Sequence, residues 1–131
     1  MKRLLPILLA AVIVATVAAA ALYQFQPDAL IEARFAAERL RAGASEKRLV
    51  VGEHEWRYLE AGDGPPLLLV HGFSGSKENW LPLMPYLVDH HRVIAVDLPG
   101  WGETTRLPDA DYGIPAQAGR VVDFIAAMGL Q

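Results

Sequence analysis

The sequence has 131 residues, a net charge of −3 and no cysteine, and 53% of its residues are hydrophobic. It contains no basic block or stripe, which argues against nucleic acid as a partner, and the lack of cysteine excludes disulfides and thiolate chemistry. Charged residues of both signs are scattered beyond the N-terminus, as is typical of a globular protein rather than a disordered one.

The N-terminal residues 1–23 predict a signal anchor or a signal peptide. A basic start, MKR, precedes an uncharged apolar run from Leu4 to Leu22, which as a helix at about 1.5 Å per residue just spans a bilayer core of about 30 Å. An uncleaved single-pass membrane anchor, a signal cleaved near Ala18 to Ala21 and a buried core helix are the alternatives. The basic start favours an exported body, and cleavage gives a secreted or periplasmic one.

Residues 24–46 predict an amphipathic helix followed by a linker. Apolar residues recur at three-to-four spacing from Asp28 to Arg41, with charged residues between them. Asp28 is the predicted cap and Gly43 the predicted end of the helix. The helix either lies along a membrane surface or packs on the body as a spacer.

The body, residues 47–131, alternates short strands with helices. Residues 48–52 and 55–60 predict a hairpin, and residues 67–71 and 92–97 are apolar runs typical of strands buried on both faces of a sheet. Residues 78–88 predict a helix that prolines confine to short pieces, and residues 115–128 predict a longer one. This order predicts an α/β fold with a mixed sheet, covered on both faces, and functional loops at the carboxyl ends of the strands.

Two motifs follow the two apolar strands: His71 to Trp80 after the first, and Asp97 to Thr104 after the second. Together they resemble the early motifs of the α/β-hydrolase superfamily, and most resemble those of bacterial lipases and esterases and membrane-anchored monoacylglycerol lipases. The resemblance covers residues 47–131 and implies the N-terminal half of the hydrolase sheet, with strands 1–4 and helices A and B. It also implies a Gly-x-Ser-x-Gly elbow directly after Gln131, so the nucleophile and the triad are expected outside this chain.

In that superfamily the loop at His71, Gly72 and Phe73 implies an oxyanion hole. Attack of a hydroxyl on an ester carbonyl places negative charge on the carbonyl oxygen, and one N–H aimed at it is worth about 3 to 4 kcal/mol. Phe73 is the expected backbone donor, Gly72 permits the sharp turn, and His71 fixes the loop by hydrogen bonds. The alternative is that His-Gly simply ends a buried strand. Phe73, Trp80 and Trp101 are the candidate acyl-pocket residues, with core packing as the alternative for the tryptophans.

The other polar residues of these motifs and loops are expected to have structural rather than catalytic roles. Ser74 is not expected to be a nucleophile, because Ser76 stands where an elbow requires glycine. Asp97 is expected to hold the turn that follows it. The remaining histidines lack metal-site spacing and are expected in exposed loops: His54, His90 and His91. No metal or cofactor is expected.

The expected protein is a membrane-tethered serine hydrolase of the lipase or carboxylesterase type, acting on ester bonds of lipid-like substrates. This chain carries its oxyanion-loop half and is expected to be inactive alone. Two alternatives remain: another chemistry on the same scaffold, such as epoxide or haloalkane hydrolysis with an Asp nucleophile, and a non-catalytic fragment or binding module. A small-molecule ester and the membrane are the expected partners.

Overall fold

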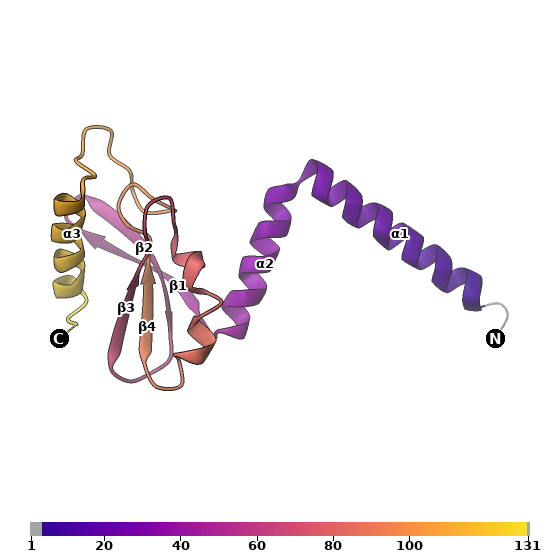
Figure 1. Cartoon of the computed structure of the whole chain (residues 1–131), viewed down its shortest axis with the longest axis horizontal. Helices are drawn as coiled ribbons and strands as arrows, with labels where there is room; N and C mark the ends of the chain where they lie inside the picture. Colours follow the sequence, from indigo (N-terminus) through magenta and orange to yellow (C-terminus); the bar gives the residue numbers. More distant parts are fainter. Residues whose placement is uncertain (1–3, 131) are drawn as a thin grey trace. The chain divides into compact units, whose positions relative to one another are not determined.

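The computed structural model describes residues 4–130 (Figure 1). The chain divides into two compact units, one ending at Ala37 and the other beginning at Glu38. In the first unit α1 (Leu4–Phe25) buries none of its side chains. Within the described residues it is the one helix that is long and apolar enough to cross a membrane. The N-terminal helix therefore fits a membrane span or a signal sequence, as its composition predicts.

Helix α2 (Pro27–Arg41) forms where a helix is predicted, with Ile31 and Leu40 of its apolar positions exposed. Asp28 lies inside its first turn rather than at the cap, where its charge still favours the positive end of the helix. Gly43 lies in the turn that terminates the helix, as predicted, and its φ of +61° suits glycine. The N–H of Ala44 closes this turn on the Arg39 carbonyl at 2.9 Å. The predicted linker is shorter than expected, because the next strand already begins at Ser45.

The first two strands, β1 (Ser45–Val51) and β2 (His54–Ala61), form the predicted antiparallel hairpin. Val51 pairs with His54, so only Gly52 and Glu53 make the turn. Gly52 has a φ of +59°, which the first position of such two-residue turns favours.

The sheet continues through β4 (Arg92–Val96) to β3 (Pro66–Val70), in the order β1-β2-β4-β3. β4 is antiparallel to β2 and parallel to β3. The predicted burial on both faces is confirmed for β4, where Val93 to Val96 are fully buried. It is wrong for β3, which is only half-buried because it lies at the edge of the described sheet.

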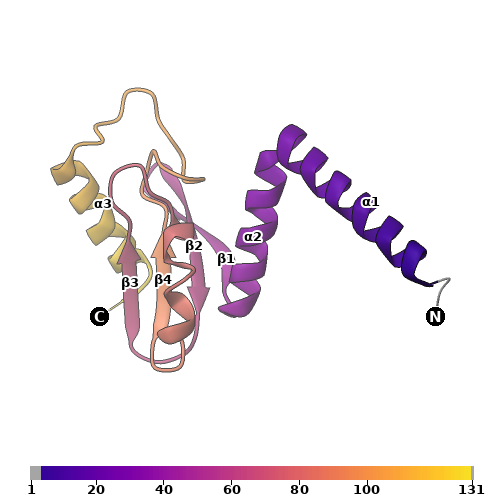
Figure 2. The same ribbon diagram turned by 45° about the vertical axis from the view of Figure 1, so that its right-hand side comes forward.

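Helical segments cover the two faces of the sheet (Figure 2). The predicted helix over residues 78–88 is two single turns of 3₁₀ helix, η1 (Lys77–Trp80) and η2 (Met84–Tyr86), as the prolines dictate. On the opposite side α3 (Ile114–Ala127) confirms the predicted long helix. Its Phe124 packs 4.7 Å from the ring of Trp56 and forms the core with β2 and β4.

Candidate active site

Both predicted motifs lie at the carboxyl ends of neighbouring strands. β3 and β4 are parallel and paired, with Val70 opposite Val96, so the loops that follow them begin side by side. We call residues 71–76 the β3 loop and residues 97–105 the β4 loop. This is the location that the strand order predicts for function.

His71 ties the β3 loop to the β4 loop. Its ring is buried, with Nδ1 2.7 Å from the carbonyl oxygen of Gly72, and Nε2 accepts the backbone N–H of Leu98 at 3.0 Å. An amide can only donate and a carbonyl can only accept, so the hydrogen bonds assign the proton to Nδ1. Both ring nitrogens are therefore occupied, which suits a loop support and not a general base.

The β3 loop makes a tight turn that presents Phe73. The N–H of Gly75 donates to the Gly72 carbonyl at 3.1 Å, and Ser74 takes a left-handed φ of +60°. The Phe73 side chain is 92% exposed, and its ring meets Trp101 edge to face at 5.0 Å. Among the described residues, no group accepts a hydrogen bond from the backbone N–H of Phe73. The turn therefore leaves the Phe73 N–H available beside an aromatic pair.

An apolar hollow of about 750 Å³ opens beside this turn. Its walls come from the end of β3, from both loops and from the first turns of α3, and include Phe73, Leu98, Trp101, Tyr112, Ile114 and Val121. Gln117 fixes the α3 wall, since its Nε2 donates to the Pro99 carbonyl at 2.8 Å. Of the predicted pocket residues, Phe73 and Trp101 come together here, whereas Trp80 lies in η1 and does not line the hollow.

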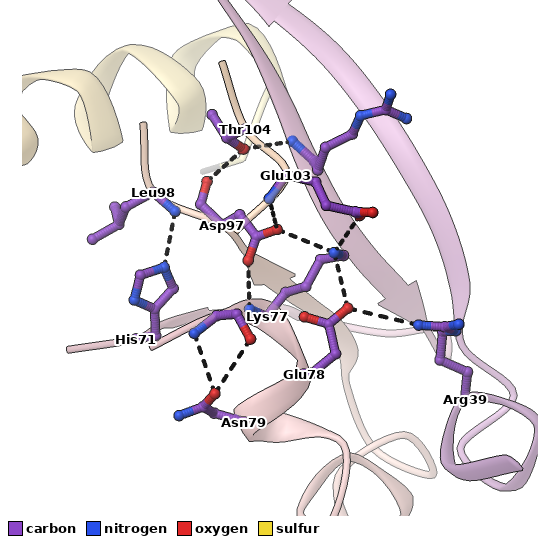
Figure 3. Close-up of polar contacts among 11 residues, drawn as sticks. Arg39, His71, Lys77, Glu78, Asn79, Asp97, Leu98, Glu103 and Thr104 are labelled. Carbon is purple, nitrogen blue, oxygen red and sulfur yellow. Dashed lines mark hydrogen bonds and ion pairs between the residues drawn. The ribbon is translucent and has the colours of Figure 1, made fainter. Parts of the chain in front are cut away.

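Asp97 is completely buried and ties the start of η1 to the β4 loop (Figure 3). Its Oδ1 accepts the backbone N–H of Lys77 at 2.6 Å, and its Oδ2 accepts the backbone N–H of Glu103 at 3.0 Å. Its carbonyl accepts the Thr104 hydroxyl at 2.8 Å. A Cβ on Gly102 would meet the Asp97 carboxylate at 2.2 to 2.4 Å, so that position needs glycine. These contacts fit the structural role expected of Asp97.

Lys77 is a site residue that the sequence does not reveal. Its ammonium lies 2.7 Å from Glu103 Oε2, 2.9 Å from Glu78 Oε1 and 3.1 Å from Asp97 Oδ2, and its side chain is 1% exposed. Burial disfavours the charge, but hydrogen bonds to Glu103 and Glu78 and the charge of Asp97 outweigh it and raise the pKa of Lys77. The lysine is therefore charged at neutral pH. One sequence gives no signal that joins a lysine to an aspartate twenty positions away.

The histidines outside the β3 loop are placed differently from one another. His90 is exposed, as predicted. His54 is not an exposed loop residue: it begins β2 and is 6% exposed, so that expectation is wrong. Within residues 4–130, no cluster of three or more His, Cys, Asp or Glu side chains is arranged to hold a metal ion.

Comparison with known proteins gives the family. The pattern of the family described as "alpha/beta hydrolase fold" matches residues 65–131. The chain therefore belongs to the α/β-hydrolase family, and its relatives include hydrolases of the lipase and esterase type.

Three relatives illustrate the match. A 2-hydroxy-6-oxo-6-(2'-aminophenyl)hexa-2,4-dienoic acid hydrolase of Metapseudomonas resinovorans is 39% identical, over 70% of this chain and 32% of that protein. A monoacylglycerol lipase of Xenopus laevis is 32% identical, over 79% of this chain and 32% of that protein. The crystal structure of a membrane phospholipase A, a bacterial virulence factor, superposes with a TM-score of 0.76 at 42% identity, covering 98% of this chain and 41% of that one. The chain thus spans about a third of the length of these two curated relatives.

Proposed function

We propose that this chain forms the oxyanion-loop part of a membrane-tethered serine hydrolase, of the lipase or carboxylesterase type, that cleaves ester bonds of lipid-like substrates. One observation carries the proposal: the backbone N–H of Phe73 has no partner among the described residues and stands in a turn that borders an apolar hollow. A free, fixed donor beside an apolar space is what a developing oxyanion on an acyl group requires.

The roles in this reaction divide between the chain and residues outside it. The N–H of Phe73 donates to the oxyanion, Gly72 allows the turn, and His71 holds the turn through its two ring nitrogens. The second N–H, the attacking serine, the histidine base and its acid come from outside these residues. We therefore expect no ester hydrolysis above background from this chain alone, and turnover abolished by Ser74→Ala would contradict the assignment.

The hollow is the proposed acyl site. Phe73 and Trp101 form an aromatic wall, and the side chains of α3 complete an apolar lining. Each methylene of an acyl chain buried there contributes about 0.8 kcal/mol. Helix α1 acts as a single-pass anchor with the body exported, which keeps the site near lipid substrates; cleavage of α1 gives a secreted or periplasmic form instead.

The oxyanion role can be tested in a chimera. Residues 1–131 replace the matching part of the membrane phospholipase A, whose remaining residues are expected to supply the triad. Nitrophenyl esters of increasing acyl length are assayed in detergent micelles. Phe73→Pro deletes the N–H and is expected to lower kcat about 100- to 1,000-fold. Phe73→Ala, the matched control, keeps the N–H and should retain kcat on the shortest ester. Unchanged kcat in a folded Phe73→Pro chimera would remove the oxyanion role.

The nucleophile needs a separate test, because the dienoic acid hydrolase among the relatives shows that similar chains act on other substrates. Sequencing the transcript beyond codon 131 distinguishes the candidates. Gly-x-Ser-x-Gly supports ester hydrolysis, and an Asp at the same place supports epoxide or haloalkane hydrolysis. A stop codon, with stable expressed protein, supports a non-catalytic binding module.

A further inference from the structure

The Lys77 ammonium joins carboxylates of the β4 loop and of η1 (Figure 3). Asp97 and Glu103 belong to the β4 loop, whereas Glu78 follows Lys77 in η1. We call Lys77 and these three acids the lysine cluster. Glu78 also lies 3.6 Å from Arg39 in the last turn of α2, so the cluster reaches to the end of that helix.

The cluster is costly as a means of stabilising the fold. Burying a charged group costs several kcal/mol per ion even after relaxation, and well-packed apolar residues of the same volume often give equal or greater stability. Lys77 and Asp97 are nevertheless almost completely buried. Ions form directional hydrogen bonds and apolar groups do not, so an ion pair fixes the orientation of its donor and acceptor groups.

The lysine cluster fixes the conformation of the β3 loop. Directly after this loop, the backbone N–H of Lys77, the first residue of η1, donates to Asp97 Oδ1 at 2.6 Å. At the near end, His71 accepts the N–H of Leu98 at 3.0 Å. Both ends are thus held by two consecutive residues of the β4 loop, and Phe73 lies between them. The ammonium of Lys77 in turn holds the Asp97 carboxylate at 3.1 Å and ties it to Glu103.

We propose that Lys77 is a positioning residue that, through Asp97 and Glu103, fixes the direction of the Phe73 N–H. In a hydrolase this acts on the oxyanion step and not on substrate binding. The effect on the oxyanion step, the kinetic half of the proposal, rests on the proposed function. The fixed orientation of the Phe73 N–H, the structural half, rests on the contacts within this chain.

The structural half is tested on the full chain in detergent micelles by ¹⁵N relaxation, which reports backbone motion on the picosecond to nanosecond scale. Lys77→Met is expected to lower the heteronuclear NOE of amides 72–76. Lys47→Met is the control, because it removes an ion pair, 2.6 Å from Glu60, that involves no residue of the lysine cluster. Unaltered order at residues 72–76 in folded Lys77→Met would overturn the proposal.

A second variant covers the case in which Lys77→Met does not fold. Glu103 is 60% exposed, so Glu103→Gln removes one carboxylate of the cluster without burying an unpaired charge. It is expected to lower order in the same amides, by less than Lys77→Met. Full order at residues 72–76 in Glu103→Gln, together with a folded spectrum, would then count against the proposal.

The kinetic half is tested in the phospholipase chimera. Lys77→Met is expected to lower kcat about tenfold with little change in KM, and Lys47→Met to change neither. If Lys77 acts through the Phe73 N–H, adding Lys77→Met to Phe73→Pro should lower kcat no further, whereas independent effects would multiply. If the two substitutions lower kcat multiplicatively, or if Lys77→Met raises KM alone, the kinetic half of the proposal is overturned. An inactive parent chimera would count against the proposed function and leave the relaxation experiment to decide the positioning role.

Discussion

The Nε2 atom of His71 accepts the backbone N–H of Leu98 at 3.0 Å, and this bond joins the loop after β3 to the loop after β4. On the other side of the same ring, Nδ1 donates to the carbonyl of Gly72 at 2.7 Å. One buried imidazole therefore satisfies a donor in one loop and an acceptor in the other. A side chain without an acceptor at the position of Nε2 leaves the Leu98 N–H unpaired, whereas the Gly72 carbonyl still accepts the N–H of Gly75.

His71→Ala is expected to lower the free energy of unfolding by about 1 to 3 kcal/mol, because the Leu98 N–H loses its acceptor in a part-buried position. Urea unfolding followed by circular dichroism measures the change. His90→Ala is the control: His90 is exposed, so a change within about 0.5 kcal/mol is expected. Equal effects of the two substitutions would show that the His71 bonds contribute little.

Gly102→Ala is expected to be far more destabilising than Gly52→Ala. Both glycines have positive φ, +52° and +59°, so both variants bear the cost of a left-handed alanine, about 1 to 2 kcal/mol. At Gly52 nothing lies within 4 Å of the added Cβ, whereas at Gly102 it meets the Asp97 carboxylate at 2.2 to 2.4 Å. We expect a loss of about 4 kcal/mol or more at Gly102, seen in urea unfolding. A loss no larger than that at Gly52 would show that Asp97 moves freely.

Local chemistry accounts for what the sequence predicts well. The Gly52 turn, the apolar run of β4 and the prolines that limit η1 and η2 act over a few residues, and the corresponding elements form as expected. The burial of β3 fails because it depends on what lies beside that strand in the sheet, which its own residues do not encode.

The site divides in the same way. His71, Gly72 and Phe73 are neighbours in sequence, and Trp101 reaches them because parallel strands end together. Trp80 is close to Phe73 in sequence, but the 3₁₀ turn that begins at Lys77 carries it away from the hollow. Lys77 resembles any surface lysine until the fold surrounds it with carboxylates. Residue patterns therefore do not predict contacts between side chains that are distant in sequence.

The stability of the body is expected to fall as the pH drops below about 6.5 because of His54. Burial, and then the nearby charge of Arg120, lowers the pKa of His54 below its ordinary value of 6.5. The folded state thus prefers the neutral ring, so its contribution is complete above pH 6.5 and is lost as the pH falls toward the folded-state pKa. Urea midpoints measured between about pH 5 and pH 8 should show this slope, and His54→Leu should flatten it. The exposed His90→Leu should leave it intact; an unchanged slope in His54→Leu would contradict the assignment.

The free edge of β3 is expected to make this chain, prepared by itself, associate with concentration. In the described sheet β3 pairs with β4 on one side only, and its residues are apolar. Such an edge can pair with another chain. A lysine on an edge strand opposes this pairing, so Val70→Lys, at a position 38% exposed, should lower the associated fraction. Val50→Lys is the matched control on the other edge strand, β1, which already carries Lys47 and Arg48. Light scattering of chains held in detergent micelles measures the difference. A monomer at all concentrations with one sharp unfolding transition would contradict the prediction.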